Sequence, residues 1–101
     1  MFIYNISIKV SHAILKEWLQ WQKEEHIPEI MSTKLFTDFR FYRLLEQDET
    51  QGVTYVIQYL ADTKMNYDLY SRDYAAKVKE KAFLKWGSSV IGFQTLMEAV
   101  Q

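Results

Sequence analysis

The 101-residue chain contains no cysteine, and this absence excludes disulfides, thiolate catalysis and cysteine-ligated zinc or iron–sulfur centres. Proline and glycine are also scarce, with one and three residues, which leaves little room for flexible linkers or long irregular loops. No run of apolar residues approaches the roughly 20 that a membrane span requires. The composition therefore predicts one folded domain over residues 1–101.

Neither sign of charge is in excess, since Lys and Arg number 12, Asp and Glu number 13, and the formal net charge is −1. Proteins that bind nucleic acid through its phosphates need a basic surplus, so we expect no nucleic-acid partner. The first ten residues lack a basic leader region, and Asn5, Ser7 and Lys9 interrupt their apolar residues, which is not typical of a signal peptide. We expect a soluble cytoplasmic protein with no membrane partner.

Aromatic residues are plentiful, at 16% of the chain, and the hydrophobic fraction of 49% is typical of a globular protein. Residues 2–10 alternate between two faces, one of them wholly apolar, and this period of two predicts a β-strand. From residue 13 the apolar side chains recur at helical spacing, which predicts a helix. This helix should end near His26, because the residue before Pro28 disfavours helical backbone, and a short helical turn should follow from Pro28 to Met31.

The second half of the chain changes again from strand to helix. A polar segment that ends in Gly52 separates two strand-like segments and predicts a hairpin loop. A helix capped by Asp62 or Thr63 has a lysine-rich end before Gly87, a residue type favoured after a helix terminus. The predicted elements are a strand at 36–46, a loop at 47–52, a strand at 53–60, a helix at 63–86 and a strand at 89–100.

The resulting order is β-α-β-β-α-β, which indicates an α+β fold of the ferredoxin-like type. Two helices then cover one face of a four-stranded antiparallel sheet and leave the other face bare. A solvated sheet face is normally polar, yet the last three predicted strands carry large apolar residues on both faces. Monomers seldom expose such a patch. We therefore predict a homodimer whose two sheets pack face to face as a dimeric α/β barrel; the alternative is that long polar side chains shield the patch.

Five short segments resemble a bacterial family that is defined as a domain of unknown function. They are residues 3–6 (IYNI), 17–21 (EWLQW), 25–29 (EHIPE), 52–55 (GVTY) and 93–98 (FQTLME). This family is similar in layout to the dimeric α/β-barrel superfamily, which includes antibiotic-biosynthesis-type monooxygenases, haem-degrading enzymes, EthD-like proteins and amino-acid-sensing regulatory domains. The resemblance implies a ferredoxin-like dimer and implies no particular activity.

His26 is the candidate functional group. Glu25, Glu29 and the negative end of the predicted helix should favour its charged form and keep its pKa within the physiological range. It is then either a general base or ligand-binding group at the mouth of a cleft, or a cap that bonds the last carbonyls of its own helix. His26 and Glu29 have a spacing that could hold a metal on a helix, but two histidines and no cysteine supply too few ligands, so no metal site is predicted.

Aromatic side chains on the two predicted helices are the other candidates. Trp18 and Trp21 lie three residues apart on the first helix, and Tyr70 and Tyr74 belong to a tyrosine stripe on the second. They either line a small-molecule cleft between helices and sheet or pack in the core. Trp18, Trp21, His26, Tyr70 and Tyr74 together form the predicted ligand-binding site.

Three functions remain open from the sequence. The first is a homodimeric module that binds a small molecule in the cleft between the helices and the sheet. The second, which follows from the resemblance, is a monooxygenase-like enzyme of the antibiotic-biosynthesis or haem-degrading type, with His26 as the one candidate base or haem ligand. The third is a protein-interaction domain that uses its sheet face. No cofactor is predicted, and no catalytic residue is assigned.

Overall fold

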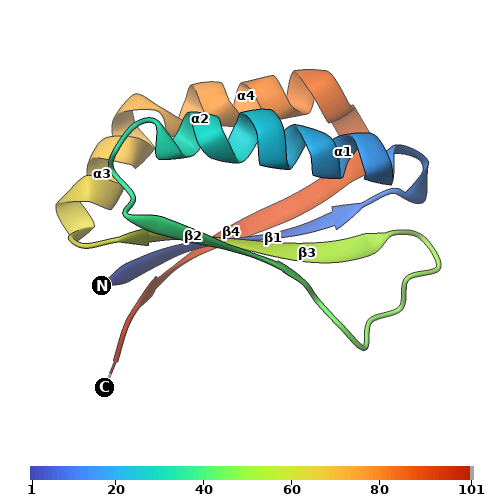
Figure 1. The fold of residues 1–101 in the computed structure, drawn as a ribbon, viewed down its shortest axis with the longest axis horizontal. Coiled ribbons are helices and arrows are strands. Elements are labelled where there is room, and N and C mark those ends of the chain that lie inside the picture. The colour runs from blue at the N-terminus through green and yellow to red at the C-terminus, as the bar shows by residue number, and fades with distance from the viewer. Residues whose placement is uncertain (101) are drawn as a thin grey trace.

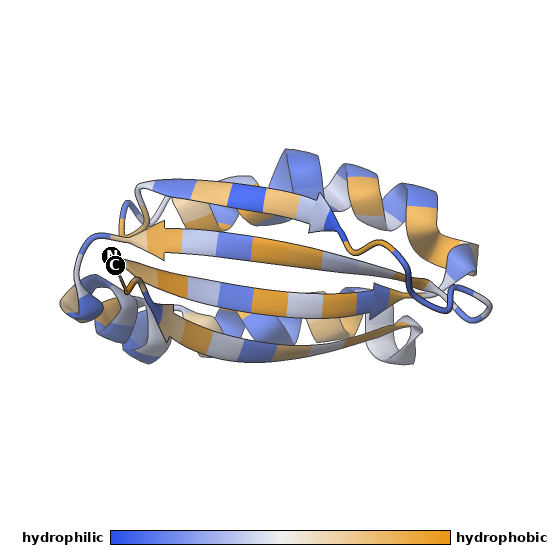
Figure 2. Cartoon of the chain, turned by 90° about the horizontal axis from the view of Figure 1, so that it is seen from below, coloured by the Kyte–Doolittle hydropathy of each residue, from blue (hydrophilic) through white to orange (hydrophobic). Residues whose placement is uncertain are grey.

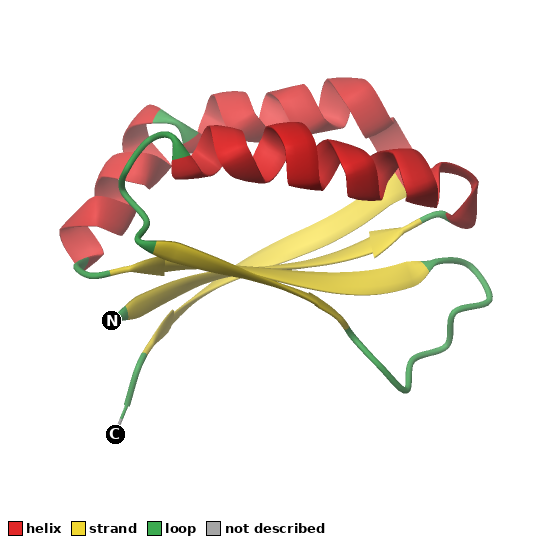
Figure 3. Cartoon of the chain, in the orientation of Figure 1, coloured by secondary structure: helices red, strands yellow, loops and turns green. Residues whose placement is uncertain are grey.

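The computed structural model describes residues 1–100, in which helices cover one face of a four-stranded sheet (Figure 1). The strands are β1 (Phe2–Val10), β2 (Asp38–Arg43), β3 (Val53–Ala61) and β4 (Val90–Glu98). They are ordered β2-β3-β1-β4, and each neighbouring pair is antiparallel. Figure 3 shows all the helices on the same side of the sheet. The predicted ferredoxin-like α+β fold is confirmed.

The first helical segment runs without a break through the proline. It consists of a 3-10 turn (His12–Ile14), α1 (Leu15–Trp21), a π-helical turn (Gln22–His26) and α2 (Ile27–Met31). In the π-helical turn the Ile27 amide donates to the Gln22 carbonyl, five residues back. This wider turn accommodates the ring of Pro28, which in a regular helix would clash with the carbonyl four residues earlier. The predicted helix end near His26 was therefore wrong.

The second helical segment is bent where one helix was predicted. It divides into α3 (Lys64–Asp73) and α4 (Ala75–Trp86), because Tyr74 leaves the helical region with φ −127° and ψ −35°. The predicted ends are confirmed: Thr63 Oγ1 accepts from the Asn66 amide at 3.2 Å, and Gly87 follows α4 with φ +56°. No helix among residues 1–100 has the length and apolar character to span a lipid bilayer.

Two strands are shorter than the sequence predicted. β2 begins after Phe36, whose ring packs in the core 5.0 Å from the ring of Tyr70 instead of joining the sheet. β2 ends at Arg43, and Glu46 adopts a positive φ of 60° as the chain turns away from the sheet. β4 ends at Glu98 rather than Val100.

The core lies between the helical layer and the two central strands. Trp18 of α1 and Tyr70 of α3 are buried against β1 and β3, where Val10, Ile57 and Tyr59 are also fully enclosed. The tyrosine stripe of α3 packs on β1, since the rings of Tyr67 and Tyr70 lie 5.4 and 5.7 Å from that of Tyr4. Burial of these large side chains is the main force that holds the helices on the sheet.

The opposite sheet face, seen in Figure 2, is uncovered and partly apolar. Alternation along the strands and the strand register place its side chains in rows across the sheet. A central polar row contains Arg40, Gln58, Asn5 and Thr95. One flanking row contains Tyr42, Val56, Ser7 and Phe93, and the other contains Asp38, Leu60, Ile3 and Met97. The side chain of Phe93, for example, is 69% exposed to solvent. The prediction of apolar residues on both faces of the last three strands is confirmed.

Gly52 is required where the loop meets the sheet. A Cβ at this position would lie 2.5 Å from the main-chain oxygen of Val10 at the end of β1. We expect Gly52→Ala to lower the free energy of unfolding by about 2 kcal/mol, because the backbone must move to relieve the clash. Urea denaturation measures this, with the exposed neighbour Gln51→Ala as the control. Equal stability of the two variants would contradict the close approach.

Candidate functional site

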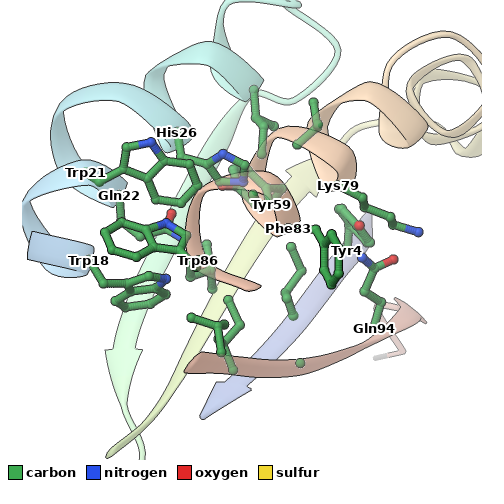
Figure 4. Close-up of a pocket in the computed structure, with 18 of the residues that line it drawn as sticks. Tyr4, Trp18, Trp21, Gln22, His26, Tyr59, Lys79, Phe83, Trp86 and Gln94 are labelled. Carbon is green, nitrogen blue, oxygen red and sulfur yellow. The ribbon is translucent and has the colours of Figure 1, made fainter. Parts of the chain in front are cut away.

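A cavity of about 300 Å³ lies between the helical layer and the sheet. α1, the π-helical turn and α4 border it on the helical side, and β1, β3 and β4 form its floor (Figure 4). All three tryptophans of the chain, Trp18, Trp21 and Trp86, line it. A space of this size among aromatic walls is large enough for a small organic molecule.

The π-helical turn places two buried polar residues at one end of this cavity, which we call the inner end. Gln22 and His26 are the first and last residues of the turn, and both line the cavity. The imidazole of His26 is stacked on the indole of Trp21, with the ring centroids 4.3 Å apart. Trp21 in turn meets Trp86 of α4 edge-on at 5.6 Å. The inner end is therefore enclosed by aromatic rings from both helical segments.

Four buried polar atoms that belong to cavity-lining residues have no hydrogen-bond partner among the described residues. They are Gln22 Oε1, His26 Nδ1, Tyr59 Oη and Trp86 Nε1. Gln22 Oε1 accepts a hydrogen bond and Trp86 Nε1 donates one, while a phenol and a neutral imidazole each do both. Buried polar groups in folded proteins nearly always have a partner. The four atoms thus mark the cavity as a place where a further polar group would be stabilised.

The charge state of His26 differs from the prediction. Burial lowers the pKa of His26 from its ordinary value of 6.5 to about 4, and nearby Lys81 adds to this, while Glu29 opposes it. The side chain is only 8% exposed, so loss of hydration outweighs the attraction of the carboxylate. No helix end is present beside it, because the helical backbone continues into α2. His26 is therefore neutral at physiological pH, and the predicted charged, switching histidine was wrong.

The tyrosines of the cavity are neutral as well. Burial raises the pKa of Tyr59 and of Tyr4 far above the usual range, and the proximity of Tyr70 raises both further, with a smaller contribution from Tyr4 at Tyr59 and from Tyr67 at Tyr4. Tyr70 follows the same pattern, with burial again the main cause and Glu29 the second. These three tyrosines of the cavity lining consequently offer uncharged hydrogen-bonding groups.

The other end of the cavity, which we call the mouth, is exposed. Lys79 and Phe83 of α4 and Gln94 of β4 line it, and Figure 4 shows them on the side away from Trp21 and His26. Phe83 is 69% exposed although it borders the cavity. The mouth therefore opens between α4 and the edge strand β4.

Four of the five predicted site residues line this cavity: Trp18, Trp21, His26 and Tyr70. Tyr74 does not, since it lies at the bend between α3 and α4, is 42% exposed and stacks on the outside of Tyr70. The sequence analysis missed Gln22, Tyr59 and Trp86. A buried glutamine four residues before the histidine gives no signal in a helical pattern until the π-helical turn is known. Tyr59 and Trp86 lie within the predicted strand at 53–60 and the predicted helix at 63–86, and nothing in those two patterns distinguishes them from core residues.

No group of three or more His, Cys, Asp or Glu side chains within residues 1–100 is arranged to hold a metal ion. The salt bridge between Glu29 of α2 and Lys81 of α4, at 2.7 Å, joins the two helical segments above the cavity. Both partners are exposed, so we expect this ion pair to contribute little to stability by itself.

Solved structures of low sequence identity share the fold. An ethyl tert-butyl ether D (EthD) family protein from Bacillus halodurans C-125 has a TM-score of 0.68 and 14% identity, covering 99% of this chain and 100% of its own. A Deinococcus radiodurans protein described as an antibiotic biosynthesis monooxygenase has a TM-score of 0.69 and 13% identity, and the match covers 100% of this chain and 94% of that protein. A dimeric ferredoxin-like protein from an uncultured marine organism has a TM-score of 0.69 and 13% identity, and the match covers 99% of this chain and 95% of that protein. The class of structure is thus ferredoxin-like.

The family follows from the sequence. The chain belongs to the family described as Domain of unknown function (DUF4286), whose model matches residues 1–100. This confirms the resemblance carried by the five short segments. No protein of curated function matches the chain in sequence.

The lowered pKa of His26 has a consequence for stability. Between pH 6.5 and 4 the unfolded chain binds a proton at His26 that the folded chain does not. The contribution of neutral His26 to the free energy of unfolding is therefore fully present above pH 6.5 and is lost as the pH falls toward 4. The full loss amounts to roughly 3 kcal/mol. We expect His26→Gln to flatten the dependence of unfolding free energy on pH over this interval, measured by urea denaturation. The exposed His12→Gln is the control, and a slope unchanged in His26→Gln would contradict the buried neutral imidazole.

Proposed function

We propose that the protein binds a small, mainly aromatic molecule in the cavity between the helices and the sheet. The observation that carries this proposal is a set of four buried polar atoms that have no partner among residues 1–100 and that belong to residues lining the same space of about 300 Å³. Each unsatisfied group of this kind costs about 1–3 kcal/mol. A ligand with a hydroxyl or carbonyl group at the inner end would satisfy several of them at once.

The side chains of the cavity walls indicate the chemistry of the remaining, apolar part of the ligand. Three indoles and the ring of Phe83 face the cavity, together with aliphatic side chains such as Ile6 and Val78. Flat aromatic ligands gain both dispersion and burial energy against such surfaces. The neutral state of His26 and of the tyrosines favours an uncharged group at the inner end.

Ala82 of α4 lines the cavity and can be enlarged to fill it. We expect 2-naphthol to bind the wild type with an affinity of about 1 mM or tighter and to shift the indole N–H signal of Trp86 in NMR spectra. Ala82→Phe should weaken this binding at least tenfold, because the added ring occupies the ligand's space.

The control is Ala76→Phe, which adds the same ring at an exposed position on the same helix, outside the cavity. Absence of any shift in the wild type, or equal binding by both variants, would contradict a ligand cavity. Shifts confined to residues of the open sheet face would also contradict it.

The open sheet face supports a homodimer. Similar structures are described as dimeric ferredoxin-like proteins, and the uncovered face of this chain has one mainly apolar row on each side of a polar row, with Ser7 and Asp38 as the polar members of the two flanking rows. A two-fold axis through the polar row would bring the apolar rows of two copies together. Within that row Gln58 already donates to Asn5 at 3.2 Å, so these amides enter the interface partly satisfied. Burial of the apolar rows would then stabilise the dimer.

Phe93 lies in one of these rows. We expect Phe93→Lys to weaken dimerisation by at least about 100-fold, because a charge without a partner would be buried. Sedimentation velocity at micromolar concentration measures this. Leu84→Lys, at an exposed apolar residue of α4, is the control and should remain dimeric. A wild type that sediments as a monomer would refute the dimer.

A monooxygenase-like activity is the second candidate, since two of the similar structures carry a monooxygenase description. The unpartnered Nδ1 of His26 could accept a proton from a bound phenol. With a pKa of about 4, however, His26 is a weak base at neutral pH, and this favours binding over catalysis. The third candidate, a protein-interaction domain, would use the same sheet face as the dimer. Dimerisation and that function therefore exclude each other.

A further inference from the structure

The residues at the two ends of the cavity differ in charge. The inner end holds the neutral side chains of Gln22, His26 and Trp86. The mouth holds the ammonium group of Lys79 and the amide of Gln94, and Figure 4 shows the two sets of residues apart. A ligand that fills the whole cavity would therefore meet uncharged hydrogen-bonding groups at one end and a cation at the other.

α4 sets the distance between these ends. Lys79, Phe83 and Trp86 follow one another at intervals of four and three residues, so they lie on one face of the helix and all line the cavity. Seven residues of helix between Lys79 and Trp86 correspond to about 10 Å. Two fused aromatic rings with a substituent at each end have this length.

Lys79 is the charged residue of the cavity lining at physiological pH, because His26, the other titratable base that lines it, is neutral. Among residues 1–100 it forms no salt bridge, whereas Lys81 on the same helix is paired with Glu29. An ammonium group at the edge of an apolar space attracts an anion more strongly than one in open water. Gln94 on the facing strand offers an amide donor to the same group.

Building on the proposed binding function, we propose that the ligand is a hydroxylated or carbonyl-bearing aromatic acid. Its carboxylate lies at the mouth against Lys79 and Gln94. Its rings lie between Phe83 and the indole of Trp86, and its neutral polar group meets His26 and Gln22 at the inner end. Phe83 covers the ligand from the solvent side, which accounts for a large aromatic side chain placed at an exposed position.

The test compares two probes of the same shape and different charge, 6-hydroxy-2-naphthoate and 6-hydroxy-2-naphthamide. Dissociation constants come from NMR titration of the indole N–H signals. We expect the wild type to bind the naphthoate about fivefold more tightly than the amide at low salt, a preference that decreases with added salt. Lys79→Gln should abolish this preference, so that the variant binds the two probes with equal affinity.

Lys77→Gln is the matched control, since Lys77 is an exposed lysine of α4 that does not line the cavity, and it should keep the preference. Equal affinity of the wild type for both probes would overturn the aromatic acid while leaving the cavity as a binding site. A preference that survives in Lys79→Gln, or that Lys77→Gln also removes, would overturn the role of Lys79. If neither probe shifts the indole signals, both this proposal and the proposed function fail.

Discussion

The π-helical turn at Gln22–His26 is the local constraint on which the cavity depends. Because its carbonyl pairing extends over five residues, the helix passes Pro28 without breaking and remains long enough to lie across the sheet. The same turn directs its two terminal residues, Gln22 and His26, towards the sheet, where both are buried without a protein partner for one polar atom each. Single π-helical turns of this kind are frequent at functional sites.

Much of the fold could be predicted from the sequence, because each element has a periodic pattern that local physics produces. The alternation in residues 2–10 and the caps at Thr63 and Gly87 are examples. The π-helical turn could not be predicted, because proline is normally associated with a helix boundary and the pattern of apolar residues around it is also consistent with two helices. The charge state of His26 depends on its burial in the folded protein and on Lys81 of α4, which is distant in the sequence, whereas the neighbouring glutamates alone predict a charged imidazole.

The site was recognised by residue type and only in part by position. Trp18, Trp21, His26 and Tyr70 are conspicuous as large or titratable residues, and all four lie on the cavity. Tyr74 shares the helical spacing of Tyr70, but the bend after α3 turns it outward. Lys79 is one of four lysines in α4, and the sequence alone does not separate it from neighbours that face solvent. Only the position of β4 beneath the helix distinguishes it.

The placement of the tryptophans has a practical consequence. Since all three indoles border one cavity, the tryptophan emission of this protein, excited selectively above the absorption of tyrosine, originates from a single region of the molecule. The emission will therefore be insensitive to events at the open sheet face and will respond to whatever changes the polarity between the helices and the sheet. Changes in the cavity and changes at the open sheet face can therefore be distinguished without an attached dye.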